Sequence, residues 1–242
     1  MGFVNILKKS INMYKSNLLV SIIFGVLYLL ILIFVGGIAY GGSNYILKAS
    51  NDDPLLMIIG SFLLLFFISS IESLSYVSIL EYFYKKVIGN IQKSKNAFKI
   101  WFVYISVINI LVGLLMIFID IISINELLFG PVVIILLAIL IFVILAYTYS
   151  LYASVLGKTD KLSINFGKSL KILAYSAIWM ILSFIALFAV LFIIVSIIVI
   201  LSLGESVLIA VALLLILSSI YITIIPIQHL IIANTILEED KG

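Results

Sequence analysis

The chain has 242 residues, of which 65% are hydrophobic and only 10% are charged, with a formal net charge of +3. Soluble domains are nearer to roughly 45–50% apolar and about 25% charged, so the composition excludes an ordinary water-soluble fold and indicates a bilayer as the solvent. The chain has no cysteine and one histidine, His229, which excludes disulfides, thiolate metal sites and His-rich metal sites.

Long apolar runs with few or no charges indicate six membrane-spanning helices. A span needs about 20 apolar residues, and the alternating pattern of barrel strands does not occur in stretches such as Val190–Leu201. The runs cover approximately residues 17–40, 54–84, 100–119, 131–156, 172–204 and 206–237. We therefore predict an all-α polytopic membrane protein with one six-span domain over residues 1–242. Its three hairpin units cover approximately 1–84, 85–156 and 157–242.

The lysines indicate how the chain is oriented. All 14 basic residues are lysine, and only Lys48 falls at the ends of spans opposite the termini. The others are Lys8, Lys9, Lys15, Lys85, Lys86, Lys93, Lys95, Lys99, Lys158, Lys161, Lys168, Lys171 and Lys241. Because lysine concentrates in cytoplasmic loops, we expect a multi-pass protein of the cell membrane with both termini in the cytoplasm.

The short pattern Ser-x-Asn-x-x-Lys opens all three hairpins. Its copies are Ser10–Lys15, Ser94–Lys99 and Ser163–Lys168. Because they lie at the same topological point, we expect an internal repeat. Serine and asparagine commonly cap helices and form turns, so the pattern favours a corner before each span. A lipid-headgroup site is the second interpretation.

Each copy lies in a short amphipathic stretch. Apolar residues fall on or near one helical face in all three: Phe3, Leu7, Ile11 and Tyr14; Val87, Ile91 and Phe98; Leu162, Phe166 and Leu170. These spacings predict a short interfacial helix before each hairpin, with lysines towards headgroups. The candidate headgroup-binding residues are Lys15, Lys93, Lys95, Lys99, Lys168 and Lys171. Membrane lipids with anionic headgroups at the cytoplasmic face are the expected partners.

Two stretches, Tyr76–Lys99 and Tyr149–Lys171, carry a family likeness. In the second, Tyr149-Ser150-Leu151-Tyr152-Ala153 leads into a short polar turn, and Asn165-Phe166-Gly167-Lys168-Ser169 opens the next helix. The chain resembles a broad family of prokaryotic six-helix integral membrane proteins of mostly unknown function. Some members form the membrane region fused to glycerophosphodiester phosphodiesterases. The resemblance implies a six-helix membrane fold and no catalytic residues.

Glu72 is a carboxyl inside the second apolar run, where an ionised group is costly. His229, Asn109 and Tyr149 lie at similar distances from the cytoplasmic ends of their runs, which is consistent with a polar layer. We expect Glu72 inside the bundle, paired with His229. Asn109 or Tyr149 is the alternative partner. Pro226 should kink the sixth span, either freeing a carbonyl for a site or merely bending the helix.

Two classes of function stay open. The first is an integral membrane protein without enzymatic activity, which organises lipid or a partner at the cytoplasmic face. The second is a transporter of a small solute or ion that uses Glu72 and His229. The loops supply no catalytic dyad, triad or metal set, so we expect neither an enzyme nor a cofactor. Lysines at helix ends without a soluble domain argue against nucleic-acid binding.

Overall fold

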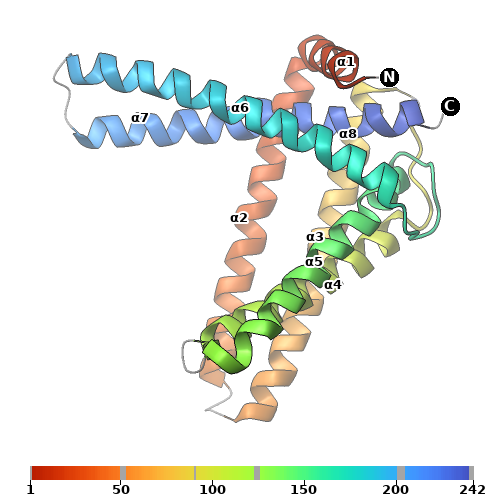
Figure 1. Cartoon of the computed structure of the whole chain (residues 1–242), viewed down its shortest axis with the longest axis vertical. Helices are drawn as coiled ribbons and strands as arrows, with labels where there is room; N and C mark the ends of the chain where they lie inside the picture. The colour runs from red at the N-terminus through yellow and green to blue at the C-terminus, as the bar shows by residue number, and fades with distance from the viewer. Residues whose placement is uncertain (1, 50–52, 90, 123–125, 201–204, 240–242) are drawn as a thin grey trace. The chain divides into compact units, whose positions relative to one another are not determined.

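A computed structural model of the chain describes residues 2–49, 53–89, 91–122, 126–200 and 205–239 (Figure 1). Lys241, assigned above to the cytoplasmic side, lies outside these residues. The described residues form helices and turns, without a strand among them. The helices are α1 (Phe3–Ser16), α2 (Leu18–Ala49), α3 (Pro54–Val87), α4 (Ala97–Ile122), α5 (Glu126–Val155), α6 (Phe166–Ile200), α7 (Glu205–Ser218), the π-helix η1 (Ser219–Ile224) and α8 (Ile225–Glu239).

Six stretches of these helices are long and apolar enough to cross a membrane. They are Leu18–Ile46, Leu55–Val87, Ala97–Leu115, Gly130–Val155, Phe166–Ser196 and Ala210–Glu239. The last stretch includes the second part of α7, the whole of η1 and the whole of α8. Helices are suited to the bilayer interior because their main-chain N–H and C=O groups are hydrogen-bonded to one another within the segment. The all-α, polytopic membrane fold predicted from the sequence is confirmed.

Glycines with positive φ follow two of the spanning helices. Gly89 has a φ of 106° just beyond α3, and Gly157 has a φ of 72° just beyond α5. At the end of α5 the N–H of Gly157 donates to Ser154 O (3.2 Å) and that of Lys158 donates to Ala153 O (2.8 Å). This pair of bonds is a Schellman motif, which satisfies the last carbonyls of a helix. The chain can therefore turn within a few residues into the next span.

The chain divides into two compact units that each combine distant parts of the sequence. The terminal unit consists of Met1–Leu29, Phe83–Asn90 and Leu170–Gly242, and the central unit of Leu30–Tyr82 and Ile91–Ser169. The division cuts across the three consecutive hairpin units expected from the sequence, which remain a prediction. Each unit is described below by itself.

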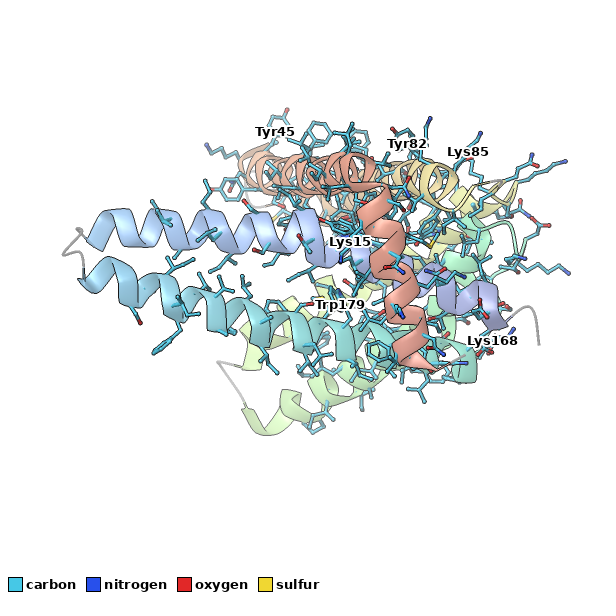
Figure 2. The ribbon with its side chains drawn as sticks, turned by 90° about the horizontal axis from the view of Figure 1, so that it is seen from above. Lys15, Tyr45, Tyr82, Lys85, Lys168 and Trp179 are labelled. Atoms are coloured by element: carbon cyan, nitrogen blue, oxygen red, sulfur yellow. The ribbon has the colours of Figure 1, made fainter. Side chains whose placement is uncertain are left out.

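In the terminal unit, α1 lies across the hairpin of α6 with α7 and α8 (Figures 1 and 2). Ile6 of α1 is buried against Ile227 and Ile231 of α8. Partly buried side chains of α1 and α6 surround this core: Leu7, Ile11, Tyr14, Tyr175 and Trp179. The apolar face of α1 thus packs against other helices of the chain.

In the central unit, α4 and α5 form an antiparallel pair that lies side by side along its length (Figure 1). The indole N–H of Trp101 on α4 donates to the carbonyl of Leu151 on α5 (2.9 Å), and both residues are buried. The second half of α2 and the first half of α3 also meet closely. Gly60 faces the side chain of Ile46, and Gly42 faces that of Leu64. Glycine permits this approach because it has no Cβ.

Only the first of the three expected amphipathic helices is a separate helix, α1. The second stretch lies at the end of α3, in the loop before α4 and in the first turn of α4. The third lies in the loop after α5 and in the first turns of α6. The difference has a local cause. Gly89 and Gly157 end the preceding helices, and Asn96 and Asn165 stand at the N-cap positions of α4 and α6.

Candidate functional site

Glu72 joins a polar cluster between α3 and α4 in the central unit. The side-chain amide of Asn109 on α4 donates to Glu72 Oε2 (3.0 Å) and also to Ser69 Oγ (3.1 Å). Ser69 is fully buried, and it lies one helical turn before Glu72 on the same face of α3. Asn109 therefore serves as a polar partner of the carboxyl, in the place that we first assigned to His229.

His229 is buried in the terminal unit among aromatic rings. The ring of Phe24 lies edge-on to the imidazole, with centroids 5.3 Å apart, and the ring of Tyr28 lies 5.7 Å away. The hydroxyl of Tyr84 donates to the main-chain carbonyl of His229 (3.3 Å). Because Glu72 and His229 belong to different units, their pairing stays a prediction.

The sixth span is interrupted by one π-helical segment, η1, which ends two residues before Pro226. Pro226 has no N–H, so the carbonyl four residues earlier, that of Ile222, lacks its α-helical donor. The hydroxyl of Tyr14 on α1 donates to this carbonyl (3.2 Å). The indole N–H of Trp179 on α6 donates to the carbonyl of Ile224 (3.0 Å). Side chains of two other helices therefore bind the irregular main chain.

This hydrogen bond bears on the two interpretations of Pro226. The Ile222 carbonyl accepts from a side chain of the protein, which favours a structural role over a ligand site. We did not foresee the partners Tyr14 and Trp179 from the sequence. A proline inside a span signals that donors are needed nearby, but it does not say which distant tyrosine or tryptophan supplies them.

The second copy of the Ser-x-Asn-x-x-Lys pattern fastens the two lysine-rich loops of the central unit together. The hydroxyl of Ser94 donates to the carboxylate of Asp160, and the side-chain amide of Asn96 donates to the carbonyl of Asp160 (3.1 Å). The main-chain N–H of Ser94 donates to Ser154 O (2.8 Å). Gly157 lies so near this loop that a Cβ on it would be 2.1 Å from Gln92 O. The two loops are therefore joined at several points.

The third copy caps α6. Asn165 Oδ1 accepts a hydrogen bond from the main-chain N–H of Lys168 (3.2 Å), which is the usual contact of an N-cap side chain. The main-chain N–H of Asn165 donates to the carbonyl of Ala146 on α5 (3.0 Å). In the second and third copies the asparagine thus stands at the same N-cap position. This matches the corner that the pattern predicts.

The first copy differs, because Ser10, Asn12 and Lys15 all lie within α1. The buried Ser10 accepts a hydrogen bond from the side-chain amide of Asn234 on α8 (2.9 Å). The corner before α2 falls instead at Asn17, whose side-chain amide donates to Met13 O (3.0 Å). The three copies are alike in sequence, but only the second and third have the same structure, with the asparagine directly before a helix.

The candidate headgroup-binding lysines fall into two groups. Lys93 forms an ion pair with Glu81 (2.6 Å), Lys171 pairs with Glu239, and Lys168 lies over the ring of Tyr149 with Nζ 4.8 Å from its centroid. Tyr149, which we considered as a partner for Glu72, thus contacts the first turn of α6. Lys15, Lys95 and Lys99 are exposed and form no ion pair within the described part of the chain. These three are the best placed to bind an anion.

Comparison of the chain with protein-family models, with curated proteins and with solved structures found no match. The resemblance to the six-helix family stays a prediction.

Proposed function

We propose that the chain is a multi-pass protein of the cell membrane, with both termini in the cytoplasm. It binds anionic lipid headgroups at the cytoplasmic face and has no enzymatic activity. One observation carries this proposal. Every described lysine except Lys48 lies in α1 or at the ends and loops that join α3 to α4 and α5 to α6. With six spans, all of these segments come to one side of the bilayer, and lysine-rich ends face the cytoplasm.

The ion pairing and exposure of the lysine side chains support a role in binding lipid as well as in orienting the chain in the membrane. Glutamates form ion pairs with Lys9, Lys93 and Lys171. Exposed lysines remain beside these pairs, including Lys95 and Lys99 on the fastened loops. Each lysine near an anionic surface contributes about 1 kcal/mol of attraction. The same cap position of Asn96 and Asn165 supports an internal repeat in the second and third hairpins.

The test compares two lipids that differ only in headgroup charge. The purified chain in mild detergent is mixed with equal amounts of phosphatidylglycerol and phosphatidylcholine with the same acyl chains, and bound lipid is counted by native mass spectrometry. We expect a preference for phosphatidylglycerol that weakens with added salt. It should decrease when Lys93, Lys95 and Lys99 are changed together to glutamine, whereas Lys48→Gln should retain it. Equal binding of the two lipids would contradict the proposal.

The alternative function is transport of a small solute or ion through Glu72 and His229. The presence of a carboxyl within an apolar span supports it, because such groups commonly mark ion pathways. The bonds from Asn109 and the aromatic surroundings of His229 favour a structural role instead. Proton flux into liposomes that contain the protein, measured with a pH-sensitive dye, should equal that of empty liposomes. A flux abolished by Glu72→Gln would favour the transporter.

A further inference from the structure

Two features of the central unit lie on one face of α4, one at its start and one just beyond its middle. A crevice that contains Lys99 lies at its first turn, and an apolar groove against α3 lies further along it. We propose that together they bind one anionic phospholipid, with its headgroup in the crevice and one acyl chain along α4 into the groove. The inference rests on the proposed function and assigns a site to it.

The crevice combines cationic and apolar side chains at the level of the loops. Lys99 and Lys161 line it together with the polar groups of Asn96 and Asp160. The apolar part of its wall consists of Ile100, Val103 and Leu162. Two lysines against one carboxylate leave a net positive charge, and the Asp160 carboxylate already accepts the hydroxyl of Ser94. An anionic phospholipid matches this lining, because its headgroup can contact the lysines while its acyl chain contacts the apolar side chains.

The crevice is held in shape before any lipid arrives. Asn96 stands directly before α4 and donates its side-chain amide to the carbonyl of Asp160, which lies in the neighbouring loop next to Lys161. This bond ties the start of α4, and with it Lys99, to the loop that carries Lys161. These segments lose little conformational freedom when a lipid binds, and such preorganisation favours affinity.

An exposed apolar stripe leads from the crevice along α4. Val103, Val107, Ile110 and Leu114 recur at helical spacing after Lys99, and each is between 38% and 40% exposed. Val103 and Leu114 are 11 positions apart, which is about 16 Å along a helix at 1.5 Å per residue. Half of a bilayer's hydrocarbon core is about 15 Å thick. The stripe therefore has the length of an acyl chain in one leaflet.

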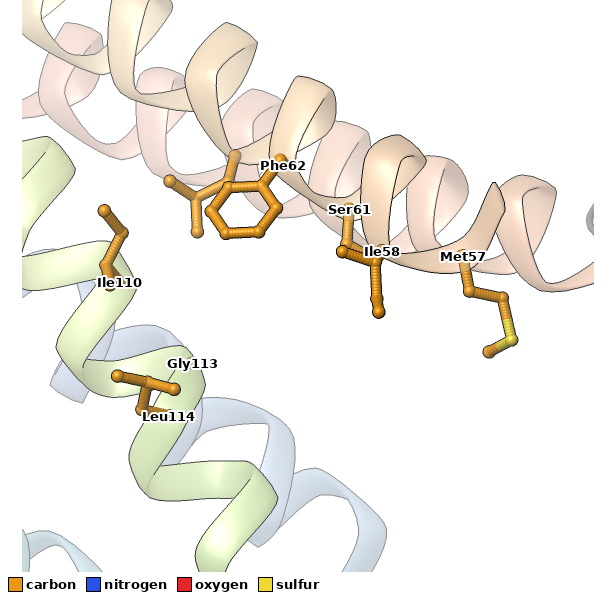
Figure 3. Close-up of a pocket in the computed structure, with 8 residues that line it drawn as sticks. Met57, Ile58, Ser61, Phe62, Ile110, Gly113 and Leu114 are labelled. Carbon is orange, nitrogen blue, oxygen red and sulfur yellow. The ribbon is translucent and has the colours of Figure 1, made fainter. Parts of the chain in front are cut away.

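The far end of the stripe forms one wall of the groove (Figure 3). Ile110, Gly113 and Leu114 of α4 face Phe62 and Leu65 of α3 across it, and nearly all of its surface is apolar. A Cβ on Gly113 would meet no atom within 4 Å, so there is open space beside this residue. Most lipid-facing helices offer an apolar stripe. Here the stripe also connects a cationic crevice at one end to a groove at the other.

The experiment uses the full chain in mild detergent, with phosphatidylglycerol and phosphatidylcholine titrated separately and followed by native mass spectrometry. Changing Lys99 and Lys161 together to glutamine should weaken phosphatidylglycerol binding by roughly 10- to 30-fold. The matched control changes Lys85 and Lys86, two lysines at the end of α3, to glutamine and removes the same charge outside the crevice. An equal loss in both variants would overturn the site and leave only a diffuse positive surface.

A second pair of variants tests the groove with the lysines intact. Gly113→Leu should fill the open space and weaken phosphatidylglycerol binding by roughly 3- to 10-fold, because the chain loses its packing contacts. Gly36→Leu is the control, since Gly36 is also helical and a Cβ on it meets no atom within 4 Å. Unchanged binding to the Gly113 variant would overturn the acyl-chain part of the proposal.

Two further results separate the remaining explanations. If sn-glycerol 3-phosphate displaces the lipid at equal concentration, the ligand is a free phosphate compound and the lipid assignment is wrong. If the unchanged chain does not prefer phosphatidylglycerol, the proposed function fails, and the site fails with it. If the chain prefers phosphatidylglycerol but the Lys99 and Lys161 variant behaves like its control, the site alone is wrong.

Discussion

The hydroxyl of Tyr14 donates a hydrogen bond to the main-chain carbonyl of Ile222, at a distance of 3.2 Å. Ile222 is the residue whose carbonyl would accept from position 226 in an α-helix, and position 226 is a proline without an N–H. A side chain of α1 therefore supplies the hydrogen-bond donor that Pro226 cannot provide in the sixth span. This bond links residues 208 positions apart within the terminal unit.

Removing the Tyr14 hydroxyl should destabilise the protein. Tyr14→Phe keeps the ring in the cluster around Ile6 but takes the hydrogen bond from the Ile222 carbonyl, at a cost of about 0.5–1.5 kcal/mol. A lower midpoint of thermal unfolding in detergent would report this change. Tyr45→Phe is the control because Tyr45 is 73% exposed. Equal midpoints for the two variants would mean that the bond contributes nothing.

The same interrupted segment lies against α2 at Gly25. A Cβ built on Gly25 would be 1.8 Å from Tyr221 O and 2.7 Å from the carbonyl carbon. Both of these atoms belong to the main chain of η1, which cannot swing aside as a side chain can. Gly25→Ala should therefore force the helices apart and destabilise the protein by about 1–3 kcal/mol.

The control for this substitution is Gly37→Ala in the same helix. A Cβ on Gly37 meets no atom within 4 Å, and alanine is the better helix former by about 0.8–1 kcal/mol. The two variants should shift the unfolding midpoint in opposite directions. A stabilising Gly25→Ala would show that α2 and η1 are not in close contact.

The positions of the spans could be predicted because they depend on local composition. Apolar runs long enough to cross a bilayer form helices whatever they contact, and Gly89 and Gly157 end two of them for local reasons as well. We missed the loops after these glycines because Val87, Ile91 and Phe98 have helical spacing. Spacing alone could not reveal that Gly89, with its positive φ, interrupts the helix between them.

Contacts between distant helices could not be predicted in this way. The sequence named Asn109 as an alternative partner of Glu72 only because the depths of the two residues match. Depth does not say that α3 touches α4 at that point. For α1, the amphipathic pattern of Leu7 and Ile11 predicts an apolar face but not what covers it, and here α8 and α6 cover it.

Glu72 and Asn109 should behave as a coupled pair. Glu72→Gln retains an acceptor for the Asn109 amide and should change stability little. Glu72→Leu leaves that amide without its carboxyl partner and should cost about 1–3 kcal/mol. Replacing both residues with leucine should restore part of this loss, so that the two single effects are not additive.

Thermal unfolding of the three variants and of the unchanged protein in one detergent provides the measurement. Ser70→Ala is a suitable control because Ser70 bonds only within its own helix, to the carbonyl of Phe66 (2.8 Å). Additive effects of Glu72→Leu and Asn109→Leu would contradict the coupling and remove the reason to regard the cluster as one unit.

The topology gives the last prediction. The chain has no cysteine, so single cysteines placed at Ser43 and Ser163 can be labelled without background. Both side chains are exposed, and they lie at opposite ends of the spans, Ser43 near the end of α2 and Ser163 just before α6. In intact cells a membrane-impermeant maleimide should label position 43 and not position 163, and permeabilised cells should show both.

Lys95→Cys should behave like Ser163→Cys, because the Ser94–Asp160 contact fastens the loops that carry them. Labelling of positions 43 and 163 from the outside would mean that they share one side of the membrane. The six-span arrangement and the cytoplasmic lysine-rich face would then both be wrong.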